Sequence, residues 1–141
     1  MIKTESAYKK ALLKLREDQV FIQNEKERFK ELGLTDEQVK IAIEPQISFH
    51  EQLKEEVEYY EKIKRGEFEP IINFTNIGKT LIAYRIYIGM SQLELANLMG
   101  VPNSQVSRDE KNEYYGATKE RLQEVMEAMG MKTITTIEVA S

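Results

Sequence analysis

The sequence predicts an all-α protein with a helical hairpin at its N-terminus, a second helical domain and a short C-terminal β-strand. Apolar residues recur every three to four positions along most of the chain, which is the spacing of one helix face. Helix start and stop signals separate these periodic segments. Only the last stretch, MKTITTIEVAS, has the composition of a strand. We therefore expect boundaries at residues 1–70, 71–132 and 133–141.

The first long helix is predicted from its apolar stripe and from the signals that follow it. Gly33 is suited to end this helix as a C-terminal cap. The next helix starts at Thr35, because Thr35 and Gln38 have the spacing of a reciprocal capping box and Leu34 can pack on Val39. The stripe of the first helix comprises Tyr8, Leu12, Leu15, Gln19, Ile22, Lys26 and Phe29.

Pro45 is predicted to end this second helix early, since proline disrupts helix interiors. A third helix then runs to about Gly66, with a stripe of Phe49, Leu53, Val57, Tyr60 and Ile63. The stripes of the two long helices must be buried against each other or against a second copy. The interspersed charges favour a solvated outer face over an arm that binds a protein partner. Residues 67–76 are the expected linker.

Three short helices are predicted next, at residues 77–88, 91–99 and 103–111. Gly89 and Gly100 close the first two, and Ser91 with Glu94 repeats the capping box. A helix, a tight turn and a second helix result. The expected core comprises Leu81, Ile82, Leu95, Ala96, Met99, Val101 and Val106.

The segment IGKTLIAYRIYIGMSQLELANLMGVPNSQVSRDE resembles the Cro/repressor (Xre-type) helix-turn-helix family, whose fold is that of the lambda repressor. The resemblance covers about fifty residues and is carried by the pattern SQxELAxLxGVxxSQVSRxE. It implies a sequence-specific regulator that binds double-stranded DNA as a homodimer, most simply a repressor. In that family, the helix matching residues 103–111 enters the major groove.

The resemblance also implies roles for individual residues. Arginine can donate twice to guanine and asparagine can pair with adenine, which suits base recognition. An ion pair between Arg85 and Glu110 would tie the first short helix to the third and orient it. The implied base contacts are Asn103, Ser104 and Arg108, and the implied backbone contacts are Gln92, Gln105, Ser107, Lys111 and Tyr114.

This chain departs from the family pattern at Leu93 and Leu98, where the family is usually polar, and at two positions of the third short helix. Pro102 occupies the usual capping position of the third short helix and has no side-chain acceptor, so that Asn103 takes over the cap or the cap is missing. Asp109 replaces a commonly apolar residue and brings a negative charge near the DNA.

A fourth helix is predicted from Thr118 to Gly130, and a strand after it. In antitoxins related to this family, a C-terminal strand pairs with its copy across a two-fold axis, and the resemblance implies the same here. A disordered end is the alternative.

The composition excludes several classes of function. The 141 residues contain no cysteine, no apolar run of membrane-spanning length and no secretory signal, so we expect a cytoplasmic protein without a membrane role. The formal net charge is -4, but residues 71–141 carry seven basic and eight acidic groups and are nearly neutral. Positive charge is what DNA binding draws on, so a monomer should bind weakly.

Catalysis is not expected. His50 is the only histidine, and beside Glu51 and Glu55 it makes a poor metal site. No phosphate-binding glycine loop or nucleophile motif is present. We therefore predict a protein that is not an enzyme and needs no metal or cofactor. The alternative function is an antitoxin-type module whose N-terminal hairpin masks a toxin or regulator and which autoregulates its operon.

Overall fold

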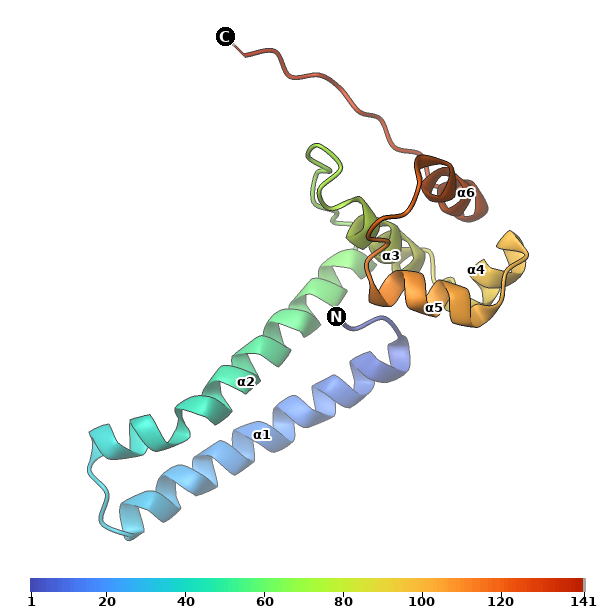
Figure 1. The fold of residues 1–141 in the computed structure, drawn as a ribbon. Helices are drawn as coiled ribbons and strands as arrows, with labels where there is room; N and C mark the ends of the chain where they lie inside the picture. Colours follow the sequence, from blue (N-terminus) through green and yellow to red (C-terminus); the bar gives the residue numbers. More distant parts are fainter. Residues whose placement is uncertain (141) are drawn as a thin grey trace. The chain divides into compact units, whose positions relative to one another are not determined.

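The structure is a computed structural model that describes residues 1–140, and these form six helices and no strand (Figure 1). The all-α class is therefore confirmed. The chain divides into two compact units, the first from Met1 to Lys62 and the second starting at Ile63. The helices are α1 (Glu5–Glu31), α2 (Asp36–Lys64), α3 (Ile77–Tyr87), α4 (Gln92–Met99), α5 (Asn103–Lys111) and α6 (Lys119–Met129).

In the first unit, α1 and α2 form the predicted hairpin, and its turn has the predicted caps. Gly33 adopts a φ of +89°, which ends α1. The Gln38 amide donates to the Thr35 hydroxyl at 3.2 Å, and the Thr35 amide donates to the Gln38 side chain at 2.9 Å. The Thr35 hydroxyl and the Gln38 side-chain oxygen thus each accept from a backbone amide that has no acceptor within the helix.

The open end of the hairpin is fixed by aromatic contacts. The rings of Tyr8 and Tyr60 stack with their centroids 4.7 Å apart, and the Tyr60 hydroxyl donates to Glu5 at 3.0 Å. Burial, reinforced by the Glu5 carboxylate, raises the pKa of Tyr60 to about 12. These contacts set the antiparallel register of α1 and α2.

Pro45 does not end a helix, and the prediction of a separate short helix is wrong. α2 continues through Pro45, and Figure 1 shows it bent after its first turns. The amide hydrogen bond that proline cannot make leaves the carbonyl of Ile41 free, and Ile41 is 74% exposed, so water can serve that carbonyl. A buried or half-buried stripe, mostly apolar, continues in one register on both sides of Pro45: Val39, Ile43, Gln46, His50, Leu53, Val57 and Tyr60. Phe49, expected in the stripe, lies outside it and is 70% exposed.

The second unit is a bundle of α3 to α6 around the predicted core. Leu95 and Ala96 of α4 are fully buried between the neighbouring helices, as are Leu81 and Ile82 of α3 and Val106 of α5. The Ser91 hydroxyl accepts the Glu94 amide at 3.0 Å and starts α4, as predicted. The helix bounds agree with the expected ones to within about two residues, the usual uncertainty of helix ends.

The segment after α2 belongs to the second unit and does not separate two domains. The Phe68 ring packs edge-on against Tyr87, with centroids 5.4 Å apart, and lies 6.1 Å from the ring of Tyr84. Lys64 donates to the carbonyl of Ile86 at 3.4 Å. The division of the chain therefore falls at residue 62, before the predicted linker.

The predicted C-terminal strand is not formed, because residues 131–140 make neither helix nor strand. Ile134, Ile137 and Val139 are at least 77% exposed. A strand needs a partner for its backbone groups, and none lies among the described residues. Among residues 1–140, none of the helices combines the length and the hydropathy that a membrane span requires.

Gly78 of α3 is a position where no side chain can fit, which gives a test of the bundle. A Cβ at this position would overlap the backbone carbonyl of Glu113, in the turn after α5. Gly78→Ala should lower the free energy of unfolding by about 3 kcal/mol, although an ordinary helical glycine-to-alanine change stabilises by about 0.5–1 kcal/mol. Chemical denaturation measures the difference.

The matched control is Gly89→Ala. Gly89, unlike Gly78, has a positive φ, and nothing lies within 4 Å of an added Cβ. Gly89→Ala should lower the free energy of unfolding only by the strain of alanine in the left-handed conformation, about 1–2 kcal/mol. Equal losses in both variants would contradict the close packing of α3 against the 113–114 turn.

Candidate nucleic-acid interface

The turn between α4 and α5 is short and fixed by backbone hydrogen bonds. Gly100 takes a φ of +68°, and the Val101 amide donates to the carbonyl of Ala96 at 3.0 Å. Pro102, with a φ of -64°, is the N-cap residue directly before α5. Because the turn spans so few residues, α4 and α5 are held in contact with each other.

α5 has one buried face and one exposed face. Val106 and Glu110, four residues apart, are each 1% exposed and lie in the core. Gln105 and Asp109 are half-buried at the edge of this face. The exposed face carries five of the predicted site residues: Asn103, Ser104, Ser107, Arg108 and Lys111.

The N-terminal end of α5 lacks a side-chain cap, which is one of the two outcomes expected from Pro102. No side chain accepts from the first amides of the helix, and Asn103 lies inside the helix as its first residue. Asn103 and Ser104 are both exposed. An open helix N-terminus presents amide donors and a partial positive charge, a combination that suits a phosphate.

The predicted ion pair between Arg85 and Glu110 is formed and connects α3 to α5. The two N–O distances are 2.5 and 2.8 Å, and the side chains are 3% and 1% exposed. Arg85 also donates to the carbonyl of Met90 at 2.7 Å. The pair is therefore bidentate, and it ties α5 to both α3 and the turn after α3.

Gln92 has a role in this buried cluster. Its side-chain amide donates to Glu110 at 2.9 Å, so that the half-buried Gln92 braces α5 from the start of α4. The predicted phosphate contact of Gln92 stays a prediction.

Tyr114 does not have the exposed position that a phosphate contact needs, and this assignment is corrected. It is 6% exposed, and burial, followed by the charges of Glu110 and Asp109, raises the pKa of its hydroxyl. Both Glu113 and Tyr114 have positive φ angles in this turn. The neighbouring Tyr115 is 93% exposed.

A second ion pair on α5 was not predicted. Arg121 of α6 contacts Asp109 at 2.5 Å, and the Gln105 side-chain amide donates to the other carboxylate oxygen of Asp109 at 3.2 Å. Arg108 in turn donates to the Gln105 carbonyl oxygen at 3.1 Å. Asp109 and Glu110 are adjacent, so they point about 100° apart on the helix toward different neighbours. That adjacency was the available sequence signal for a second partner.

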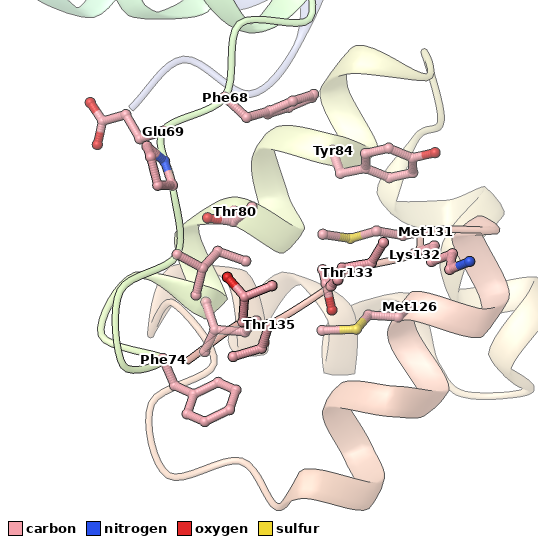
Figure 2. Close-up of a pocket in the computed structure, with 15 residues that line it drawn as sticks. Phe68, Glu69, Phe74, Thr80, Tyr84, Met126, Met131, Lys132, Thr133 and Thr135 are labelled. Atoms are coloured by element: carbon pink, nitrogen blue, oxygen red, sulfur yellow. The ribbon is translucent and has the colours of Figure 1, made fainter. Parts of the chain in front are cut away.

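A groove of about 480 Å³ lies elsewhere in the second unit (Figure 2). It is lined by the segment before α3, by α3, α6 and the first residues of the tail, among them Phe74, Thr80, Met126 and Thr133. No residue of α4 or α5 lines it. Within the described residues, no three His, Asp or Glu side chains are grouped closely enough to hold a metal ion.

Comparisons with family models, with curated proteins and with solved structures give no match to this chain. Its function is therefore inferred from its own residues and their geometry.

The Arg85–Glu110 pair gives a test of how α5 is held. Arg85→Met and Glu110→Met should each lower the free energy of unfolding by about 3–5 kcal/mol, because each leaves an unpaired buried charge. The double variant should recover most of that loss, since no charge then remains buried. Denaturant titrations of the two single variants and the double variant measure this. Arg108→Ala, at an exposed position, is the control and should change stability by less than about 0.5 kcal/mol. Additive losses in the double variant would contradict a coupled pair.

Proposed function

We propose that the second unit binds double-stranded DNA in a sequence-specific manner, with α5 in the major groove. The protein then acts as a transcriptional regulator of the Cro/repressor (Xre-type) kind, as a dimeric repressor. One observation carries this proposal: the polar face of α5 is exposed, while a bidentate buried ion pair fixes the opposite face.

The exposed face has the chemistry that base recognition needs. Arg108 can donate to guanine, Asn103 can pair with adenine, and Ser104 can reach either bases or phosphates. The nine residues of α5 span about 14 Å, close to the width of the major groove, about 12 Å. The uncapped helix N-terminus offers amides to a phosphate at the same end as Asn103.

The charge of the second unit supports modest affinity for each subunit. Asp109 and Glu110 are both paired with arginines, which reduces the repulsion that these two carboxylates would exert on phosphates. Arg108 and Lys111 supply the exposed positive charge of α5. Two subunits on a nearly palindromic site would double these contacts, which is why the proposal includes a dimer.

The decisive experiment selects bound duplexes from a random pool at low salt. On the selected duplex, Arg108→Ala should weaken binding about 5- to 150-fold and should relax selection at one base pair. Lys111→Ala should weaken binding to all duplexes by a similar factor, since a phosphate contact carries no sequence information. Electrophoretic mobility shifts measure both effects.

Arg16→Ala, an exposed arginine of α1, is the matched control and should leave binding unchanged. Unaltered discrimination by Arg108→Ala would remove the base contact. A wild-type protein that enriches no sequence would remove the proposed function itself.

The hairpin supports a second candidate function, the binding of a protein partner in the manner of an antitoxin. Several large apolar side chains on α1, on α2 and in the turn between them are between 51% and 74% exposed: Leu13, Val20, Phe21, Leu32, Ile41 and Phe49. Within α1, all of which is described, only Ala11 is buried. The hairpin therefore leaves apolar surface that a partner could cover.

Phe21 and Phe49 are the side chains to test on this surface. Counted from the Tyr8–Tyr60 stack, they lie about 20 Å and about 17 Å along their helices, at a similar height. Phe21→Ser with Phe49→Ser should leave the thermal unfolding of the chain nearly unchanged, because both side chains are already exposed. The double variant should lose a protein that co-purifies stoichiometrically with the wild type from the native cell.

Gln23→Ser with Glu51→Ser is the control, because these two exposed polar residues lie on the same helices but point away from the phenylalanines, which lie two positions earlier in the sequence. Co-purification that survives the loss of both phenylalanines would rule out a partner on this face. A wild type that purifies without any stoichiometric partner would do the same.

A further inference from the structure

We propose that Asp109 and Arg121 are positioning residues for DNA recognition, which hold Gln105 and through it Arg108 in a fixed orientation before DNA binds. This inference rests on the proposed function of α5. It concerns two side chains that the sequence did not assign to base or phosphate contacts.

The chain of contacts starts at the edge of the core. Arg121 reaches from α6 to one carboxylate oxygen of Asp109 at 2.5 Å, and the two side chains are only 27% and 22% exposed. Arg121 makes this contact through a terminal nitrogen, while its buried Nε has no hydrogen-bond partner among the described residues. The contact between Arg121 and Asp109 therefore uses one nitrogen of the guanidinium.

Asp109 then determines how the amide of Gln105 is turned. An ionised carboxylate only accepts hydrogen bonds, so Gln105 must present its NH₂ group to Asp109, at 3.2 Å. The carbonyl oxygen of Gln105 is thereby left for another donor. Arg108, three residues further along α5, donates to that oxygen at 3.1 Å.

The contact between Gln105 and Arg108 is too weak to hold Arg108 by itself. An exposed pair at this spacing on a helix shifts an equilibrium by only about twofold. Gln105 is half-buried, however, and is held by Asp109, which Arg121 holds in turn. Each side chain therefore restricts the motion of the next, from Arg121 of α6 through Asp109 and Gln105 to the exposed guanidinium of Arg108. Preorganising a side chain in this way lowers the entropy that it loses on binding.

The two ion pairs that hold α5, Arg85–Glu110 and Arg121–Asp109, differ in whether they contact the exposed face of the helix. Arg85 and Glu110 are buried, and their hydrogen bonds go to Gln92 and Met90 and not to the exposed face. In contrast, one carboxylate oxygen of Asp109 accepts from Arg121, and the other accepts from Gln105, which lies next to the exposed face. Arginine has five N–H donors, so after the contact with Gln105 enough remain for a bidentate contact with guanine.

A purely electrostatic role of Asp109 predicts the opposite sign. A carboxylate near phosphates repels DNA, so its removal would tighten binding to every duplex. Positioning predicts that its removal reduces discrimination between the selected duplex and a duplex changed at the base pair that Arg108 contacts. These two predictions can be separated by one pair of measurements.

The experiment compares the two duplexes for the full-length wild type and its variants. Asp109→Ala and Arg121→Met should each reduce the ratio of the two affinities by about fivefold or more. In a Gln105→Met background, Asp109→Ala should cause no further loss, because it acts through Gln105. Arg121→Lys keeps a cation opposite Asp109 and should retain most of the discrimination. Asp109→Asn keeps the shape of the side chain and serves if the alanine variant unfolds.

A second measurement needs no DNA. Nuclear magnetic relaxation of the Arg108 Nε–H group should show restricted motion in the free wild type and in Arg121→Lys. It should show increased motion in Asp109→Ala and Gln105→Met.

Two results would overturn the inference while leaving the proposed function standing. They are tighter binding of Asp109→Ala to both duplexes with an unchanged ratio, and a freely moving Arg108 in the wild type. A wild type that restricts Arg108 but selects no duplex would instead overturn the proposed function, and the positioning role with it.

Discussion

The buried bidentate pair between Arg85 and Glu110 is the interaction on which the arrangement of the second unit depends. α5 is a short, mostly polar helix, and Val106 is its one fully apolar buried side chain within the described structure. Hydrophobic burial alone therefore gives little to fix its direction. Two charges removed from water are costly unless their hydrogen bonds are satisfied. Here the contacts of Arg85 with Met90 and of Gln92 with Glu110 complete the set.

This pair also explains why the outer face of α5 is left open. Two ion pairs hold α5 in place. Glu110 binds Arg85 of α3 on the buried side of α5, and Asp109 binds Arg121 of α6 at the edge of that side. Adjacent carboxylates reach different helices because successive side chains diverge by about 100°. The constraint that orients α5 thus consumes none of the polar side chains at Asn103, Ser104 and Ser107, which remain exposed.

The local parts of the fold could be predicted because local hydrogen bonds decide them. The capping box at Ser91 and the left-handed glycine at residue 100 involve neighbours in sequence, and both were predictable. Pro45 was misjudged because the continuation of α2 depends on burial of one helix face on both sides of the proline, and this burial arises only from tertiary packing. Tyr114 was misjudged because a non-glycine turn with positive φ has no sequence signal. Arg121 was missed because its contact depends on how α6 packs.

Under the proposed function, a nearly neutral second unit must gain selectivity from orientation more than from charge. Each neutralised phosphate adds affinity that is equal for all sequences, so a unit with few exposed cations binds non-specific DNA weakly. Arg108 and Lys111 are the exposed cations of α5. With so little general attraction, the free energy lost in ordering Arg108 would be a large share of the total. A network that orders this side chain beforehand therefore matters more in this chain than it would in a strongly basic protein.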